Sequence, residues 1–157
     1  MKPLQAGDTV PALSATSHDG QKFSLQDFRG LQSVVVFFYP KDNTSVCTAE
    51  ACSFRDAYED FVSAGAAVIG VSSDPPDSHR AFADKHRLPF LLVSDSDGTW
   101  RRAFGVPKPL WILPGRVTYV IDRQGIIRHV FSALMQGPQH MQEALQVVRE
   151  LNGTTSQ

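Results

Sequence analysis

Two cysteines, Cys47 and Cys52, are the only thiols in the sequence, and their position predicts redox chemistry. They follow the apolar run Val34–Tyr39, which is typical of a buried strand, and they lie in a stretch with helical periodicity. Thr44 is a suitable N-cap for that helix, so Cys47 is expected in the first turn, where unpaired N–H groups favour a thiolate. A thiolate is the nucleophilic form of cysteine. The alternative is that both residues are small buried hydrophobic side chains.

The residues around Cys47 form a recognisable motif. Pro40, Thr44 and Cys47 have the spacing Pro-x-x-x-Thr-x-x-Cys, and the later segment Arg116–Asp122 reads as a strand that begins with an arginine. These two segments resemble the active-site motifs of the peroxiredoxins. The five-residue gap to Cys52 is similar to the subgroup called bacterioferritin comigratory protein or peroxiredoxin Q, and the resemblance covers most of the chain.

The resemblance implies a thiol-dependent peroxidase that reduces hydrogen peroxide and organic hydroperoxides and needs no cofactor or metal. In such an enzyme the peroxide oxidises one cysteine to a sulfenic acid, and a second cysteine then forms a disulfide with it. Carried onto this sequence, the roles are Cys47 as the peroxidatic cysteine, Cys52 as the resolving cysteine, Thr44, Arg116 and Pro40 as further catalytic residues, and Glu50 as the residue that orients the arginine.

Elementary chemistry explains why Thr44 and Arg116 are needed besides the thiol. A free cysteine with a pKa of about 8.5 is a few per cent ionised at neutral pH, so complete ionisation accelerates the reaction by about 30-fold at most. Most of the catalysis must come from donors directed at the peroxide oxygens, where charge develops as the O–O bond breaks. An arginine and a threonine hydroxyl supply such donors.

The spacing of the two cysteines predicts a structural change during the reaction. In an α-helix, residues i and i+5 have Cα atoms roughly 8.6 Å apart, whereas a disulfide requires less than about 7 Å. If Cys47 and Cys52 share a helix in the reduced protein, at least one turn must unwind before they can join. An external dithiol such as thioredoxin would then reduce the disulfide, and a monomer suffices for this cycle.

Composition indicates one globular domain, residues 1–157. The chain has 157 residues, 42% of them hydrophobic, and a net charge of −1 with both signs dispersed, which argues against nucleic-acid or membrane partners. No signal peptide or apolar run long enough to span a membrane is apparent, so a cytoplasmic location is expected. In that compartment a cysteine pair cycles between redox states instead of serving as a permanent cross-link.

The order of predicted elements matches a thioredoxin-like α/β sandwich, with a central mixed β-sheet flanked by helices. A turn at Asp19-Gly20 precedes the first long strand. The predicted strands are 33–39, 67–72, 90–93, 117–121 and 126–131, the last two forming a hairpin, and the predicted helices are 45–64, 77–86, 99–104 and 139–151. One face of the first helix is predicted to carry Ala51, Phe54, Tyr58, Phe61 and Val62. The last helix is expected to end at Asn152-Gly153, with a frayed tail from residue 154.

Other candidate residues have simpler interpretations. The pairs Asp74 with Asp77 and Asp95 with Asp97 are expected to cap helices. Trp111 lies in a proline-rich loop and is expected either in the core or near the active site. The five histidines are scattered without the local spacing of a metal site, so surface or capping roles are expected, with a structural role for His79 near its helix start; the histidines are at positions 18, 79, 86, 129 and 140.

Two other functions would also use a pair of cysteines on a fold of this kind. A thioredoxin-fold disulfide oxidoreductase is disfavoured because such enzymes use a Cys-x-x-Cys spacing. A copper-binding redox protein of the same fold would need the two cysteines together with a distant histidine, either His129 or His140. Insulin reduction tests the first alternative, and anaerobic copper titration tests the second.

Overall fold

The computed structural model describes residues 4–39, 42, 45–106, 117–132 and 137–155. Its elements, in chain order, are β1 (Ser14–Thr16), β2 (Lys22–Ser24), the 3-10 helix η1 (Leu25–Phe28), β3 (Ser33–Phe38), α1 (Ser45–Asp56), α2 (Tyr58–Ser63), β4 (Ala66–Ser72), α3 (Pro76–His86), β5 (Leu91–Ser94), α4 (Thr99–Phe104), β6 (Val117–Ile121), β7 (Ile127–Ser132) and α5 (Gly137–Thr155). No helix in these described ranges is long and apolar enough to cross a membrane.

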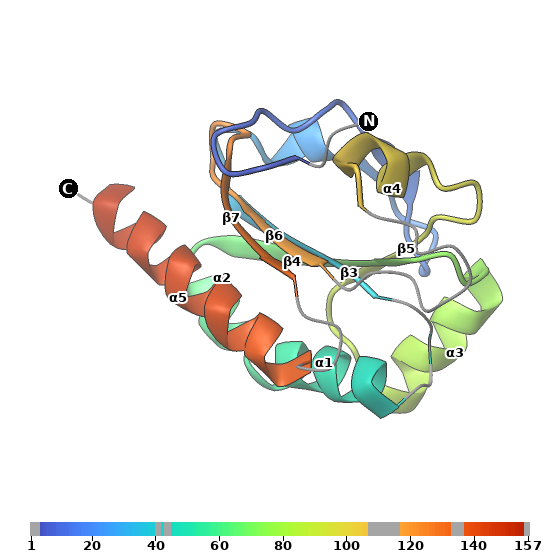
Figure 1. The fold of residues 1–157 in the computed structure, drawn as a ribbon. Coiled ribbons are helices and arrows are strands. Elements are labelled where there is room, and N and C mark those ends of the chain that lie inside the picture. The colour runs from blue at the N-terminus through green and yellow to red at the C-terminus, as the bar shows by residue number, and fades with distance from the viewer. Residues whose placement is uncertain (1–3, 40–41, 43–44, 107–116, 133–136, 156–157) are drawn as a thin grey trace.

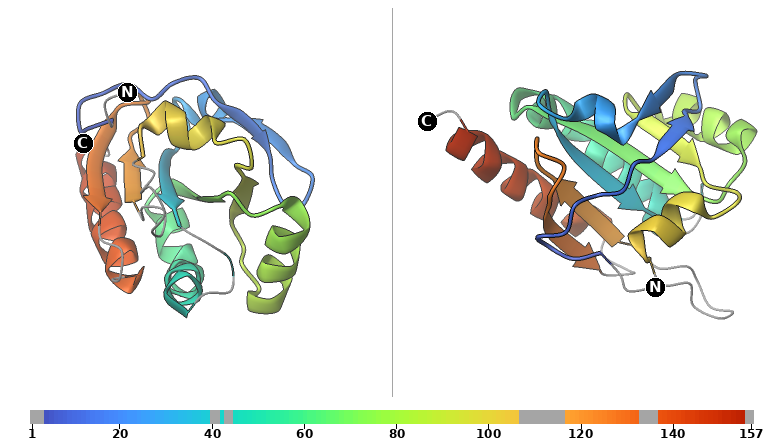
Figure 2. Two further views of the ribbon diagram at one scale, coloured as in Figure 1. Left: turned by 45° about the vertical axis from the view of Figure 1, so that its right-hand side comes forward. Right: turned by 90° about the horizontal axis from the view of Figure 1, so that it is seen from above.

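The centre of the fold is a mixed sheet with the strand order β5-β4-β3-β6-β7. Strands β3, β4 and β5 are parallel, and β6 and β7 are antiparallel to their neighbours. Helices α1, α2, α3 and α5 cover one face, whereas α4 and the N-terminal segment with β1, β2 and η1 cover the other (Figures 1 and 2). This arrangement confirms the predicted α/β sandwich.

Strand β3 is central because it is apolar on both faces. All six of its residues are buried, as expected for a strand with helices above and below. Val35 and Phe37 join the core beneath α1, while Val36 and Phe38 join the core beneath α4. Gly70 on β4 allows this close packing, since a Cβ atom there would lie 2.8 Å from Phe37 Cζ.

The predicted helix over residues 45–64 is wrong in one respect, because the chain forms two helices. Ala57 leaves the helical region, with φ −97° and ψ 6°, and separates α1 from α2. Phe54 and Phe61 still face the core on either side of this break, and their ring centroids lie 5.6 Å apart. Val62, predicted on the buried face, is 50% exposed, because α2 directs the adjacent Phe61 into the core and Val62 lies about 100° further around the helix.

The end of the last helix also differs from the prediction. Helix α5 continues to Thr155, and Gly153 keeps a helical conformation instead of ending the helix. A glycine ends a helix when it adopts a left-handed conformation, whereas Gly153 lies inside the helical run, two residues before its end. By contrast, the predicted β6–β7 hairpin is confirmed, with the Asp122 side chain accepting hydrogen bonds from the N–H groups of Gln124 and Ile126.

Candidate functional site

The two cysteines lie on α1, directly after the end of β3. Cys47 is the third residue of the helix and is buried, with 1% of its surface exposed, whereas Cys52 is half-buried. They are thiols, not joined by a disulfide. Both residues are helical, as the predicted i, i+5 geometry requires, so their Cα atoms are separated by roughly 8.6 Å. A disulfide between them therefore requires a change in α1.

Aromatic packing holds α1 against the sheet. Phe54, two residues after Cys52, stacks on Phe37 of β3 with the ring centroids 4.5 Å apart and the planes 10° from parallel. Phe90 packs edge-on against Phe37 at 5.6 Å. Truncating such a buried phenylalanine to alanine costs about 3–5 kcal/mol. The C-terminal half of α1 is thus firmly fixed to the core below it.

A buried carboxylate lies one turn after Cys47. Glu50 is fully buried, and its Oε2 is 3.7 Å from Nδ1 of His140 on α5, which is also fully buried. The same Nδ1 is 2.7 Å from the Thr118 hydroxyl on β6. The prediction of a surface or capping role is wrong for His140, because α5 packs on β6 and carries this ring into the interior. Helix α1, strand β6 and helix α5 therefore meet at this carboxylate.

A second buried carboxylate precedes α1. Asp42 is 4% exposed, and its Oδ2 lies 2.8 Å from Nδ1 of His79 and accepts a hydrogen bond of 2.8 Å from the Ser78 hydroxyl. Its Oδ1 accepts a hydrogen bond of 2.6 Å from the Tyr39 hydroxyl. The Asp42 N–H donates to Asp74 Oδ2 at 2.7 Å. We call these five residues, Tyr39, Asp42, Asp74, Ser78 and His79, the Asp42 cluster.

Burial and hydrogen bonding act in opposite directions on the ionisable groups of this cluster. Burial by itself raises the pKa of Asp42, but the hydrogen bonds from His79 and Tyr39 outweigh it, so the pKa lies below its ordinary value. For Tyr39, burial and then the neighbouring Asp42 charge raise the pKa well above the ordinary value. Tyr39 is therefore a neutral donor and Asp42 an ionised acceptor.

The predicted capping roles are confirmed for two of the four aspartates. Asp95 accepts hydrogen bonds from the N–H groups of Trp100 and Arg101 at the start of α4, and Asp97 accepts one from Thr99. Asp74 is different, because its carboxylate bonds the Asp42 N–H and the Ser72 hydroxyl. For Asp74 the prediction is wrong. This residue follows the end of β4, and its carboxylate points towards Asp42 instead of towards the backbone of α3.

Asp77 does not cap the α3 backbone either; its carboxylate makes an exposed ion pair with Arg80 at 3.0 Å. The structural role predicted for His79 agrees with its position, but the ring is fully buried. Sequence reasoning missed its link to Asp42, which lies 37 residues away in the chain. In the sequence, the one indication that Asp42 has a structural role is its place among N-cap residue types just before the cysteine helix.

Three predicted site residues, Pro40, Thr44 and Arg116, lie outside the described residues, as does Trp111. Among the residues that are described, one group of three side chains has the spacing of a metal site, Asp42 with Asp74 and His79. It contains no cysteine, and its facing carboxylate and imidazole atoms already bond one another or nearby hydroxyl and backbone groups. His129, the other copper candidate, pairs with Glu143 at 3.3 Å.

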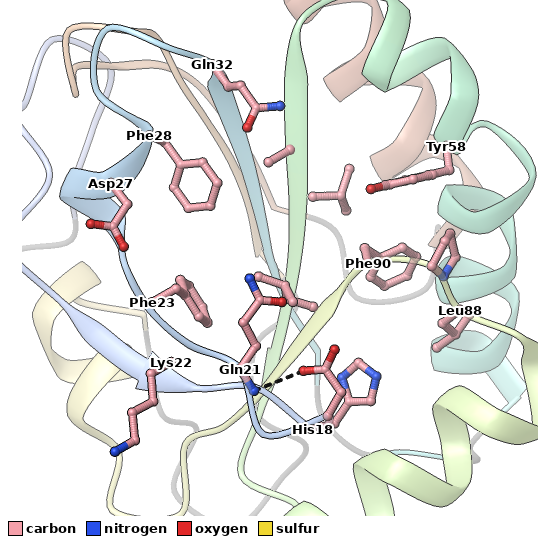
Figure 3. A pocket seen from close by; sticks show the side chains of 15 residues that line it. His18, Gln21, Lys22, Phe23, Asp27, Phe28, Gln32, Tyr58, Leu88 and Phe90 are labelled. Carbon is pink, nitrogen blue, oxygen red and sulfur yellow. Dashed lines mark hydrogen bonds between the residues drawn. The ribbon is translucent and has the colours of Figure 1, made fainter.

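A separate pocket of about 450 Å³ lies away from the cysteines, between the N-terminal hairpin and the start of β5 (Figure 3). Its lining includes His18, Phe28, Tyr58 and Phe90, and it contains neither cysteine. It lies beside Ala67 and Val68 at the beginning of β4, whereas the Asp42 cluster lies at the end of that strand. The pocket is therefore not the site of thiol chemistry.

Comparison with known proteins agrees with this geometry. The model of the AhpC/TSA family matches residues 6–130. A chloroplastic peroxiredoxin Q from Populus jackii is 45% identical over 149 residues, which cover 94% of this chain and 70% of that protein.

Solved structures give the same result. Peroxidoxin BcpB from Mycobacterium tuberculosis superposes with a TM-score of 0.86 and 34% identity, covering 94% of this chain and 98% of that one. A bacterioferritin comigratory protein from Xanthomonas campestris, studied for alkyl peroxide reduction, superposes with a TM-score of 0.83 and 28% identity, covering 92% and 99%.

Together with these relatives, the thioredoxin-type sandwich with a buried thiol at the start of the helix after its central strand shows a thiol-dependent peroxidase. The chain belongs to the AhpC/TSA family, and within it to the peroxiredoxins of the bacterioferritin comigratory protein and peroxiredoxin Q subgroup. The fold and the enzyme class predicted from the sequence are thereby confirmed.

Proposed function

We propose that Cys47 is the peroxidatic cysteine and Cys52 the resolving cysteine of a peroxidase that acts on hydrogen peroxide and organic hydroperoxides. The observation that carries this assignment is the position of Cys47 in the first turn of α1, buried at the end of β3, with Cys52 on the same helix. The alkyl peroxide reduction activity of the Xanthomonas relative supports the inclusion of organic hydroperoxides.

The first step consumes the peroxide. The Cys47 thiolate attacks one peroxide oxygen, the S–O bond forms as the O–O bond breaks, and the leaving oxygen takes a proton to become water or an alcohol. Cys47 is left as a sulfenic acid and has been oxidised by two electrons. The peroxide has been reduced by the same two electrons.

Arg116, Thr44 and Pro40 are proposed to assist this step. Arg116 would bind the leaving oxygen, the Thr44 hydroxyl would hold the peroxide proton, and Pro40, which has no N–H, would shape the loop over the thiolate. In support, the residue after Arg116 is Val117, which pairs with Phe38 at the end of β3. Glu50 is proposed to orient Arg116 from its buried position one turn after Cys47.

The second step forms the disulfide. The Cys52 thiolate attacks the sulfenic sulfur of Cys47, and the hydroxyl group leaves as water with one proton. Because both residues lie on α1, the helix must unwind between them first. The half-buried position of Cys52 suits this role, since it is less enclosed than Cys47.

A dithiol is proposed to complete the cycle by reducing the disulfide and becoming a disulfide itself, with thioredoxin or a similar protein as the donor. All the residues required lie in one chain, so we assign the activity to a monomer built as one domain over residues 1–157. The cytoplasm is the proposed location because its reducing conditions keep such a pair cycling. The plant relatives, by contrast, are named as chloroplastic proteins.

The test is hydrogen peroxide consumption with a thioredoxin system, comparing the wild type with Cys47→Ser. The serine variant should lose activity by at least about a thousandfold, because a hydroxyl is a far weaker nucleophile than a thiolate. Its melting temperature serves as the control for folding. A Cys47→Ser protein with wild-type activity would overturn the assignment.

A further inference from the structure

The Asp42 cluster fixes the chain just before the cysteine helix to three other elements. Asp42 lies three residues before α1 begins and five before Cys47. Its side chain bonds Ser78 and His79 on α3, and its N–H bonds Asp74 beyond the end of β4. The other ring nitrogen of His79, Nε2, lies 3.0 Å from the backbone oxygen of Val93 on β5.

Both ring nitrogens of His79 are hydrogen-bonded. The Val93 carbonyl can only accept, so Nε2 donates to it. Nδ1 faces Asp42 Oδ2 at 2.8 Å, and the same carboxylate also accepts from the hydroxyl groups of Ser78 and Tyr39. His79 is fully buried in this arrangement. Removing one member of the pair is disruptive, because the polar atoms of the other are left buried without their partner.

We propose that Asp42 and His79 are positioning residues. They hold the chain at residue 42, five residues before Cys47, in place in both redox states of the enzyme. The inference rests on the proposed function, in which Cys47 and Cys52 form the disulfide. The ring closed by that bond spans residues 47 to 52 and leaves Asp42 outside it. The anchor therefore confines the rearrangement to the chain after Asp42.

This arrangement predicts different effects on the two chemical steps when the anchor is weakened. The peroxide step needs Cys47 in one fixed place, so a loosened segment should slow it. The disulfide step needs the same segment to rearrange, so a loosened segment should leave the rate of that step unchanged or raise it. A purely structural role would lower protein stability without producing this divergence.

The experiment measures both steps in His79→Gln by rapid quenching, thiol alkylation and intact mass. Sulfenic acid formation should fall by about tenfold, while disulfide formation stays the same or rises. The matched control is Ile127→Ala, which removes a fully buried side chain from β7, on the other side of the sheet. In the control the ratio of the two rates should stay at the wild-type value.

A second variant keeps the test valid if His79→Gln does not fold. Tyr39→Phe removes only the hydroxyl that donates to Asp42, so it should move the two rates in the same directions by a smaller factor. Amide exchange adds a direct probe, because the Asp42 N–H is bonded to Asp74. That amide should stay protected in the wild-type protein before and after oxidation, and it should exchange faster in both variants.

The proposal is wrong if the peroxide step is unchanged, if both steps fall together as in the control, or if oxidation exposes the Asp42 amide. Failure of the proposed function is a distinct result. It would appear in the wild-type protein as the absence of a Cys47 sulfenic acid or of the Cys47–Cys52 disulfide, before any variant is compared.

Discussion

Two buried carboxylate–imidazole pairs flank the first turns of α1, and they are built differently. Asp42 lies 2.8 Å from His79 and accepts further hydrogen bonds from Tyr39 and Ser78. Glu50 lies 3.7 Å from His140, whose Nδ1 is closer to the Thr118 hydroxyl at 2.7 Å. The first pair is a direct contact, whereas in the second the threonine hydroxyl makes the shorter contact with the histidine.

Their positions in the sequence matter more than their distances. Asp42 precedes both cysteines, but Glu50 lies between Cys47 and Cys52. Any unwinding that joins the two sulfurs must therefore move Glu50, whereas Asp42 can stay in place. In the proposed cycle the two pairs therefore differ in function: the Asp42 pair supports the chain before Cys47, and the Glu50 pair must be rebuilt in each turnover.

Cys52→Ser should have the largest effect among the variants that test this difference. The variant should still reduce one equivalent of peroxide at a near-normal rate, but turnover with thioredoxin should fall by at least about a hundredfold, because no disulfide can form. Without ring closure, peroxide should leave the imidazole NMR signal of His140 unchanged, whereas in the wild type it should shift. A shift of that signal in Cys52→Ser would show that the Glu50 pair responds to something other than the disulfide.

Glu50→Gln should have an intermediate effect. The glutamine amide has nearly the same shape as the carboxylate but no charge. It should therefore hold the buried polar groups where α1, β6 and α5 meet less firmly. The second-order rate of the peroxide step should fall by about tenfold, equivalent to about 1.4 kcal/mol. Stopped-flow measurement at a pH where the thiol is fully ionised separates this effect from a change in ionisation.

The control for Glu50→Gln is Glu143→Gln, which removes a partly exposed carboxylate on α5 that pairs with His129 on β7. The rate of the control should equal that of the wild type. Equal rates in Glu50→Gln and Glu143→Gln would remove any functional distinction between the buried pair and the exposed one.

Asp42→Asn should change the pH dependence of stability. The folded pKa of Asp42 lies below its ordinary value, because the hydrogen bonds from His79 and Tyr39 outweigh the effect of burial. The stability that its ionised form contributes is therefore present above the ordinary value of 3.8 and is lost as the pH falls through the lower folded value. Denaturant unfolding between about pH 2 and 5 should show the wild type losing more stability in acid than Asp42→Asn.

Asp77→Asn is the control for this pH profile, because its carboxylate is exposed in an ion pair with Arg80. Its profile should follow the wild type closely, since exposed pairs contribute at most about 1 kcal/mol. If Asp42→Asn and Asp77→Asn have the same acid profile, the buried cluster does not hold the chain in the way proposed here.

Local patterns in the sequence predicted the elements that carry the cysteines. The apolar run before Cys47 and the helical periodicity after it were sufficient, because both features depend on residues close together in the chain. The break at Ala57 could not be predicted, since alanine favours helix and no glycine or proline marks the position. The continuation of α5 through Gly153 was missed for the opposite reason, because a common stop signal was present but unused.

The polar environment of the site was the part least accessible to sequence reasoning. His79 and Asp42 are 37 residues apart, and His140 lies on a helix near the end of the chain. Nothing in their local spacing distinguishes a buried histidine from an exposed one, because tertiary packing decides which carboxylate each one meets. Glu50 was the one buried carboxylate that could be singled out, and that prediction came from the family resemblance.

Peptide mapping after one equivalent of hydrogen peroxide tests the proposed catalytic cycle most directly. In the wild type, we predict a single new cross-link between Cys47 and Cys52 within one chain, with the loss of two hydrogens. In Cys52→Ser, we predict one added oxygen on Cys47. If peroxide is consumed while the Cys47 thiol persists, or if the disulfide joins two chains instead, the proposed cycle is contradicted.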